Sequence, residues 1–345
     1  MPRTPREGPR RPTIADIAER AGVSKVSVSY ALNGNPGLSE ATRSRILQVA
    51  KEIGWQPNRA ARALSAARSG ACGLAFARPA RTLAYEPFFN KLLAGIEAAL
   101  SAQDVALMIQ IVEDTDAEAA MLRRWWAERR VDGVLLVDLR TDDPRVATVE
   151  ELKLPAVIIG GPGHTGSLPF FPGNDAGGMH LIVEHLTSLG HRRIDRVAGS
   201  ANFAAVQVRS RIFKRLLTRA GAVGRVVGAD FTSLGGEAAT RKLLELAEPP
   251  TAVVYDNDIM AVAGLGVAQE MGARVPEDLS IVSFEDSILC EVVRPSVTAT
   301  VRDVEAFGAV AARALIEVIE GREVTPHGPQ TSSLVARRSS SRPGR

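Results

Sequence analysis

A stretch of mixed polar and apolar side chains near the start of the chain, "SKVSVSYAL" at residues 24–32, suits contact with base edges in DNA. A Lys donates hydrogen bonds to guanine, and a Val methyl packs against the methyl group of thymine. At helical spacing Val28 and Leu32 face inward. The side chains that face outward are Lys25, Val26, Ser27, Ser29 and Tyr30. A helix that lies in the major groove is short, presents such side chains from its first turn and rests on a second helix.

A second set of candidate residues lies where short β-rich runs end. Asp138 follows "VLLV", Asn257 and Asp258 follow "AVVYD", and Glu285 and Asp286 follow "IVSF". In open α/β sheets, small ligands bind beyond the carboxyl ends of the parallel strands. Carboxylates, amides and guanidinium groups bind the hydroxyls of a polyol, and an aromatic ring covers its C–H face. The pattern therefore predicts a cleft that binds a small ligand.

Three short helices over residues 13–55 are predicted to hold the DNA-reading side chains. Thr13, Ser24 and Ser39 each stand where they can cap the start of a helix, and Asp16 completes a capping box with Thr13. The small residues at 21 and 22 allow a tight corner between the first two helices. The predicted three-helix core consists of Ile14, Ile17, Ala18, Ala21, Val28, Leu32, Ile46, Val49, Ala50 and Ile53. A helical hairpin without a DNA-binding role is the alternative.

The segment "NRAARALSAARS", residues 58–69, has helical propensity but little apolar surface, so it predicts a helix that forms only conditionally, or else a flexible linker.

From residue 71 the chain alternates between β-rich runs and amphipathic helices, which indicates parallel sheets built from βαβ units. The predicted strands are "CGLAFA", "VALMIQI", "GVLLVDL", "AVIIGG", "RIDRVAGS", "RVVGAD", "AVVYDND" and "LSIVSFED". They favour two doubly wound subdomains over one sheet, with "GPGHTGSLPFFPGN" as the crossover between them. The fold class is therefore an all-α helix-turn-helix domain with a short conditional helix, followed by an α/β body of two doubly wound subdomains.

The predicted domains are a helix-turn-helix domain (12–57), a hinge helix or linker (58–69), a first subdomain (70–168 and 298–328) and a second subdomain (169–297 and 329–340). The end of the chain, "RRSSSRPGR", is predicted to be disordered.

Charge is distributed unevenly along the chain. Residues 1–68 carry twelve Lys and Arg against five Asp and Glu, whereas the remaining 277 residues carry 30 against 34. A cationic head on a mildly acidic body suits binding to a polyanion, although a solvated charged face is the alternative. No apolar run is long enough to span a bilayer and no secretory signal is visible, so a soluble cytoplasmic protein is expected. Cys72 and Cys290 are expected to be buried thiols rather than metal ligands.

Several motifs in fixed order resemble the lactose/galactose-repressor (LacI/GalR) family. The similarity begins with "TIADIAERAGVSKVSVSYALNGNPGLSEATRSRILQVAKEIGWQPNRAARALS", which resembles the headpiece of the family nearly from end to end. It continues through "EPFFNKLLAGIEAAL", "VDGVLLVDL", "VEHLTSLGHRRIDRVAGS", "AVVYDNDIMAVAGLGVAQEMGARVPEDLSIVSFED" and "RPSVTATVRD". The resemblance implies a homodimeric or tetrameric transcription regulator without a cofactor. Its body, similar to periplasmic binding proteins, would bind a small effector such as a sugar or a nucleoside.

By position, the resemblance assigns base-edge contacts to Lys25, Val26 and Tyr30. It assigns phosphate contacts, or support for them, to Ser27, Asn33, Ser39, Thr42 and Asn58. Thr13, Ser24 and Ser29 complete the predicted DNA-binding set. Many members carry Arg where this chain has Tyr30, so the resemblance does not imply the operator sequence.

The segment "NRAARAL" resembles the hinge helix that folds only on DNA. In that interpretation Ala61 and Leu64 of two subunits meet in the minor groove, and Leu64 inserts into a central base step and kinks the duplex. The resemblance therefore implies a palindromic double-stranded operator.

In the body, the resemblance assigns effector contacts to Arg209, Phe231 and Asn257. Glu285 stands where the family generally has Asp, so a longer side chain is expected to reshape the site. Gly160 stands where some sugar-binding members have an acidic residue.

Tyr85 and Phe88 flank the first strand-to-helix turn and are expected to close the cleft from the other lobe. Together with Asp138, Arg209, Phe231, Asn257 and Glu285 they form the predicted effector site. The alternatives are a core aromatic residue for Phe231 and a turn or cap residue for Asp138. Movement of the lobes is expected to change the separation of the two headpieces in a dimer, so that the effector controls DNA affinity.

The sequence disfavours two other classes of protein. An enzyme is disfavoured because the sequence lacks a Gly-x-Ser-x-Gly elbow, a phosphate loop and an intact dinucleotide fingerprint. His180, Glu184 and His185 do not have the spacing of a His-Glu-x-x-His zinc site. A solute-binding protein would share the fold of residues 71–330, but the cationic head and the missing export signal argue against it. A repressor is favoured, and a sugar-responsive activator is the remaining alternative.

Overall fold

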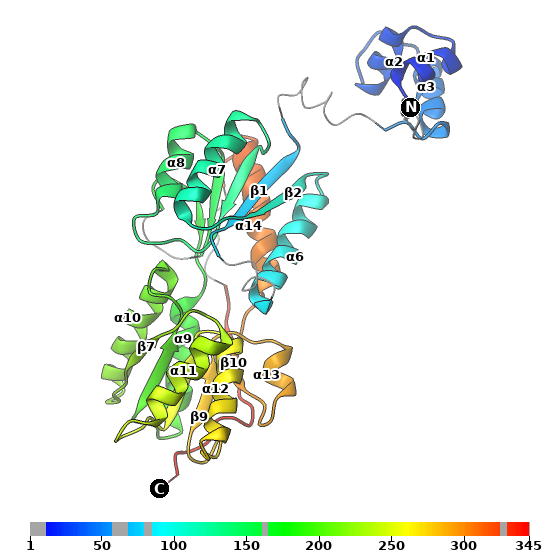
Figure 1. Ribbon diagram of the computed structural model, residues 1–345. Coiled ribbons are helices and arrows are strands. Elements are labelled where there is room, and N and C mark those ends of the chain that lie inside the picture. The colour runs from blue at the N-terminus through cyan, green and yellow to red at the C-terminus, as the bar shows by residue number, and fades with distance from the viewer. Residues whose placement is uncertain (1–11, 57–67, 79–84, 161–164, 325–329, 345) are drawn as a thin grey trace, which may run out of the picture. The chain divides into compact units, whose positions relative to one another are not determined.

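The computed structural model describes residues 12–56, 68–78, 85–160, 165–324 and 330–344. The chain divides into two compact units, Met1–Arg68 and Ser69–Arg345 (Figure 1). Each unit has its own hydrophobic core. Within the described residues, no helix combines the length and the hydrophobicity that crossing a membrane requires.

The first unit contains the three predicted helices, α1 (Ile14–Ala21), α2 (Lys25–Leu32) and α3 (Glu40–Glu52). The predicted caps are confirmed: the side-chain oxygens of Thr13, Ser24 and Ser39 each accept a hydrogen bond from a backbone N–H in the first turn. The N···O distances are 3.4, 3.1 and 3.3 Å, respectively. These bonds satisfy donors that the start of a helix otherwise leaves unpaired.

A sharp corner separates α1 from α2. Gly22 ends α1 in the left-handed region, at φ 63°, where a side chain would be strained. The three helices meet over Ile17, Val28 and Ile46, which are fully buried. Alanines at positions 18, 21, 31 and 50 complete this core and let the helices approach closely.

The first lobe of the second unit is built on five parallel strands in the order β2-β1-β3-β4-β5. They are β1 (Ala71–Phe76), β2 (Ala106–Ile111), β3 (Gly133–Leu136), β4 (Ala156–Ile159) and β5 (Phe170–Phe171). Helices α6 (Pro87–Ser101) and α14 (Val304–Ile319) pack on one face of the sheet, and α7 (Thr115–Ala127) and α8 (Pro144–Leu152) on the other.

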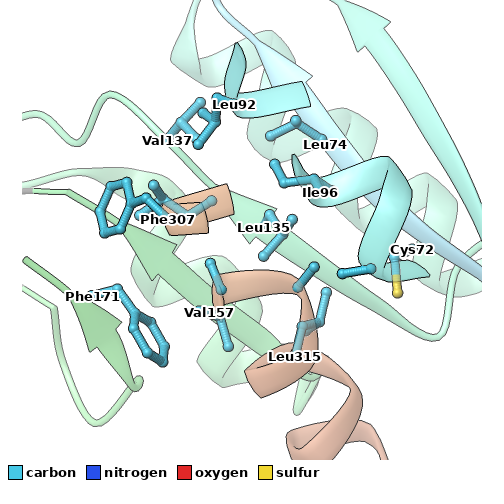
Figure 2. Close-up of a cluster of buried hydrophobic side chains, with 14 of the residues drawn as sticks. Cys72, Leu74, Leu92, Ile96, Leu135, Val137, Val157, Phe171, Phe307 and Leu315 are labelled. Atoms are coloured by element: carbon cyan, nitrogen blue, oxygen red, sulfur yellow. The ribbon is translucent and has the colours of Figure 1, made fainter. Parts of the chain in front are cut away.

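The core under α6 and α14 joins segments that are far apart in the sequence. Figure 2 shows Leu74, Leu135 and Val157, from three adjacent strands, packed with Ile96 of α6 and Leu315 of α14. Because α14 lies more than 140 residues after β4 in the sequence, the first lobe is complete only when the chain returns to it.

The second lobe is built on six strands in the order β11-β10-β9-β8-β6-β7, all parallel except β11. They are β6 (Ile194–Ala198), β7 (Val226–Gly228), β8 (Ala252–Tyr255), β9 (Ser280–Ser283), β10 (Thr298–Val301) and β11 (Ser333–Val335). Helices α9 (Asp175–Ser188) and α10 (Ala204–Arg219) cover one face, and α11 (Ser233–Leu244) and α12 (Asp258–Glu270) cover the other. A short helix, α13 (Ile288–Val292), follows β9.

Two predicted subdomain boundaries need correction. Phe170 and Phe171 pair with β4, although the sequence analysis placed them in the second subdomain. Thr298–Val301 pairs with β9 and β11, although residues 298–328 were assigned to the first subdomain. The chain therefore leaves the first lobe after β5 and returns to it after β10, where α14 begins. β5 has only two residues, and β10, with the sequence Thr-Ala-Thr-Val, lacks the run of large aliphatic residues that marked the predicted strands.

The predicted disorder of "RRSSSRPGR" is wrong for its described part, residues 337–344. Ser339 is fully buried; its hydroxyl donates to the carbonyl oxygen of Ile281 at 2.6 Å and accepts from the N–H of Thr298 at 2.8 Å. Arg337 donates two hydrogen bonds to the carboxylate of Asp286, both at 2.8 Å. A polar sequence forms an ordered strap here because its hydrogen bonds are made to the edge of the second lobe.

Replacement of this buried serine tests the strap. Ser339→Ala removes only the hydroxyl group and leaves the N–H of Thr298 and the carbonyl of Ile281 without their side-chain partner. We expect the free energy of unfolding to fall by about 1–3 kcal/mol, measured by urea denaturation. Arg338→Ala is the control, because Arg338 is exposed on the same strap and its loss is expected to cost less than about 0.5 kcal/mol. Equal effects of the two changes would contradict an ordered strap.

Candidate functional site

The predicted DNA-reading side chains lie on the exposed side of α2. Val26 is 63% exposed and Tyr30 is 42% exposed, and Lys25 beside them is exposed as well. Ser27 and Ser29 are half-buried, and Val28 on the opposite side of the helix is fully buried. The side chains predicted to contact base edges are therefore accessible on one side of α2.

Several of the predicted DNA-binding residues form hydrogen bonds with one another. The hydroxyls of Ser24 and Ser27 lie 3.0 Å apart, and those of Ser39 and Thr42 lie 2.8 Å apart. Each pair sits at the start of a helix, α2 or α3, where free N–H groups and the helix dipole favour an anion. Asn33 Nδ2 donates to Ser29 Oγ at 3.3 Å. The predicted residues Asn58, Ala61 and Leu64 lie outside the described residues.

The second unit contains a cleft between its two lobes, with about 920 Å³ of space not filled by atoms, including the part open to solvent. Most of its polar and aromatic residues follow the carboxyl ends of strands in both sheets, as predicted. Of the predicted effector residues, Phe88, Asp138, Arg209, Phe231, Asn257 and Glu285 line the cleft. Tyr85 does not line it and is 69% exposed.

On the first-lobe side, the cleft is organised around Arg78, which follows β1 and was not predicted. Its Nε donates to Asp138 Oδ2 at 2.6 Å, and its Nη1 donates to both oxygens of Glu86, at 3.1 and 3.3 Å. Burial raises the pKa of Glu86 to about 8, against the opposing effect of Arg78, and nearby Asp138 raises it further. This corner therefore places two carboxyl groups on one guanidinium, and Glu86 is largely protonated at neutral pH.

On the second-lobe side, Arg209 and Arg302 share Glu285. Arg209 Nε donates to Asp175 Oδ1 at 2.6 Å, and its Nη2 lies 4.0 Å from Glu285 Oε1. Arg302 donates to the same Glu285 oxygen. The guanidinium carbon of Arg209 also lies 4.0 Å from the ring centre of Phe284. The side chain of Glu285 thus connects two arginines on the second-lobe side of the cleft.

Phe231 is held in a conformation that a non-glycine residue rarely adopts, with φ 67°. Asn257 Nδ2 donates to the backbone oxygen of Phe231 at 3.0 Å, while Asn257 Oδ1 caps α12 by accepting from the N–H of Met260 at 2.9 Å. The edge of the ring lies on Gly199, where a Cβ would come within 1.9 Å of it. Strained residues that the surroundings hold in place are common at ligand sites.

Unpaired polar atoms also face this region. Among the described side chains, Asp258 Oδ2 and Arg302 Nε are buried without a hydrogen-bond partner. Burial raises the pKa of Asp258. Since a buried polar group without a partner is costly, both atoms are candidate contacts for a ligand that carries hydroxyl groups.

The sequence analysis missed several polar and aromatic residues of the cleft, among them Arg78, Glu86, Phe203 and Arg302. Arg78 and Arg302 follow β1 and β10, so the rule that found Asp138 also points to Arg78. Arg302 needed the location of β10, which the sequence did not show. Glu86 and Phe203 precede α6 and α10, and no pattern distinguished them.

The three side chains weighed as a zinc site do not converge. His180 lies 3.6 Å from Glu184 on an exposed helix face, while His185 bonds to Ser340 Oγ at 2.9 Å. In the described part of the chain, no group of three or more His, Cys, Asp or Glu side chains could hold a metal ion.

The raised pKa of Glu86 gives a stability prediction. A buried Glu that ionises at about pH 8, instead of about 4.3 in the unfolded chain, contributes stability at low pH that is lost as the pH rises to about 8. Glu86→Gln cannot ionise. We therefore expect its free energy of unfolding to fall less than that of the wild type between about pH 5 and 8.5, measured by urea denaturation. Glu97→Gln, on the exposed side of α6, should follow the wild type. Equal slopes for Glu86→Gln and the wild type would contradict the assignment.

Comparison with known proteins gives these two regions a context. Residues 13–58 match the family described as bacterial regulatory proteins, lacI family, and residues 183–340 match the periplasmic binding protein-like domain. The chain is 33% identical to the HTH-type transcriptional regulator CelR of Thermobifida fusca, covering 92% of this chain and 94% of that protein. It is 32% identical to the regulator MalR of Streptomyces coelicolor, over 91% and 92% of the two chains.

Solved structures agree with the sequence relatives. A structure of the Lac repressor dimer bound to operator and the anti-inducer ONPF matches with a TM-score of 0.84 at 25% identity, covering 96% of this chain and all of that one. A CelR–cellobiose complex matches with a TM-score of 0.72 at 31% identity, covering 95% of this chain and all of that one. With its helix-turn-helix headpiece and its two-lobed body, this chain belongs to the lacI family of bacterial transcription regulators.

Proposed function

We propose that this protein is a cytoplasmic, homodimeric repressor whose affinity for a palindromic operator is controlled by an uncharged saccharide bound between the two lobes. The observation that carries the proposal is that one chain combines a helix with an exposed reading surface and a cleft whose polar groups lie at the carboxyl ends of two parallel sheets. The relatives support it: the Lac repressor structure is a dimer on its operator, and CelR was solved with cellobiose.

The DNA-binding role rests on the headpiece, residues 12–56. Lys25, Val26 and Tyr30 on α2 would read base edges, and the starts of α2 and α3 would receive phosphates. The proposal retains Asn58, Ala61 and Leu64 as hinge contacts in the minor groove, with Leu64 as the side chain that enters a base step.

The charges in the cleft favour an uncharged effector. Its lining carries three guanidinium groups and six carboxyl groups. Of these carboxyl groups, Asp256 is paired with the buried Arg196 at 2.7 Å, and Glu86 is largely protonated at neutral pH because its pKa is about 8. Each of the three arginines already contacts at least one carboxylate. An anionic ligand would lie beside carboxylates that already neutralise the arginines, whereas the hydroxyl groups of a sugar can donate hydrogen bonds to those carboxylates.

Effector control requires that the two lobe arrangements bind the ligand differently. Lys91 of α6 donates to the backbone oxygen of Asp286 at 3.0 Å, and Ala204 N–H donates to the oxygen of Leu139 at 2.8 Å. Both bonds join one lobe to the other without using a cleft side chain. A ligand that changes the lobe angle would alter these contacts and thereby act on the headpieces of a dimer.

The reading role of α2 is tested by Val26→Ala. The operator is first selected from random DNA with the wild-type protein. Loss of two methyl groups from the contact surface should weaken binding to this operator about tenfold, while binding to random duplex DNA stays the same. Fluorescence anisotropy with both duplexes at fixed salt measures this. Leu47→Ala is the control, because Leu47 is an exposed apolar residue of α3 outside the predicted reading set. An unchanged operator affinity for Val26→Ala would remove Val26 from the reading surface.

The effector class is tested by matched ligands. Calorimetry with cellobiose, maltose and glucose is compared with glucuronate and glucose 6-phosphate, and each ligand is then added to the protein–operator complex. We expect uncharged sugars to bind, and the charged counterpart of any sugar that binds to be weaker by about tenfold or more. Binding of the anionic ligands alone would contradict the charge argument. No binding by any uncharged saccharide of a broad panel would reject the saccharide assignment.

A further inference from the structure

The guanidinium group of Arg78 lies where the two lobes meet over aromatic rings. Its central carbon is 4.5 Å from the ring centre of Phe203 and 5.0 Å from that of Phe231, both in the second lobe. It is also 5.1 Å from the ring centre of Phe89 in the first lobe. At these distances a flat cation is attracted by the electron-rich face of each ring.

The first lobe fixes the guanidinium in this position. Asp138 and Glu86 accept its hydrogen bonds, and only 8% of Arg78 is exposed. Asp138 adopts the left-handed conformation, with φ 55°, at the end of β3. The ion pairs lie entirely within the first lobe, so Arg78 remains in place whatever the second lobe does.

The second lobe fixes the rings. Phe231 is held by the bond from Asn257 and by its contact with Gly199, and the ring centre of Phe203 lies 6.1 Å from that of Phe231. Phe203 is the N-cap residue of α10. The N–H of the next residue, Ala204, donates the hydrogen bond to Leu139 that joins the two lobes. The two rings therefore form a rigid aromatic site with Arg78 already on it.

We propose that Arg78 is a built-in occupant of this aromatic site and thereby a determinant of effector selection. A saccharide that stacks its C–H face on Phe203 and Phe231 must displace the guanidinium, because ring faces already in contact with Arg78 leave no space for a second layer. The ligand chemistry that the site itself accepts is a flat cation held by carboxylates. The role in effector selection rests on the proposed function, whereas the cation-binding property of the site does not.

A test that needs no knowledge of the effector uses Arg78→Ala. This change removes the guanidinium and the two carbons that carry it, and ethylguanidinium supplies the same atoms as a free ion. We expect ethylguanidinium to raise the melting temperature of the variant saturably by a few degrees, with no such rise in the wild type. Urea, which is flat but uncharged, and sodium chloride at equal concentration should have no effect on the variant.

Two further variants identify the site and guard against a folding defect. The double variant Arg78→Ala/Glu86→Gln has one fewer acidic group without a partner. It replaces the single variant in the test if circular dichroism shows that Arg78→Ala alone does not fold. Adding Phe203→Leu to either variant should abolish the response to ethylguanidinium, because the ring is lost. An equal response in the wild type, or one that survives Phe203→Leu, would overturn the proposal.

Saccharide binding separates this proposal from the function it builds on. Whichever uncharged sugar binds the wild type should bind Arg78→Ala at least several-fold more tightly, and ethylguanidinium should compete with it in the variant alone. Weaker sugar binding by Arg78→Ala would mean that Arg78 donates to the ligand, which contradicts displacement. If no sugar binds either protein but the ethylguanidinium response is present, the aromatic cation site stands and the saccharide assignment fails.

Discussion

Charged side chains buried between the two lobes must be paired, and this requirement shapes the cleft. Loss of one partner of a buried ion pair costs about 3–5 kcal/mol, because the other charge is left without compensation. Arg78, Arg209 and Arg302 accordingly each lie against a carboxylate. The pairs fix side chains that would otherwise be long and mobile, so the cleft has a definite shape before a ligand arrives. The same pairing leaves carboxylate oxygens in excess, which is why hydroxyl donors suit it better than anions.

Pairing also assigns different tasks to the two lobes. In the first lobe, Asp138 and Glu86 hold a cation. In the second lobe, the side chain of Asn257 caps α12 and donates a hydrogen bond to the backbone oxygen of Phe231. A residue that the family position suggests as a ligand contact thus works first as a support. Catalytic or binding residues carried over by position alone do not reveal such a division, because it depends on backbone geometry.

The sequence was most informative where local chemistry determines structure. The caps at Thr13, Ser24 and Ser39 marked the starts of three helices, and the hydrophobic runs marked eight of the strands. It was least informative where long-range pairing decides. Phe170–Phe171 and Thr298–Val301 are strands only because a neighbouring strand offers them hydrogen bonds. Six of the seven predicted effector residues line the cleft. The rule that found Asp138 also applies to Arg78, whereas the contact of Arg78 with rings of the second lobe depends on the tertiary structure.

The position of β11 and of the strap, residues 337–344, at the end of the chain has a consequence for synthesis on the ribosome. The headpiece is made of contacts within about 40 residues and can fold as soon as they emerge, since local contacts form early. The second lobe must wait for β11, Arg337 and Ser339, which bond to β9 and β10 and to the loop that carries Glu285. A nascent chain would therefore carry a finished DNA-binding module well before it carries a finished effector site.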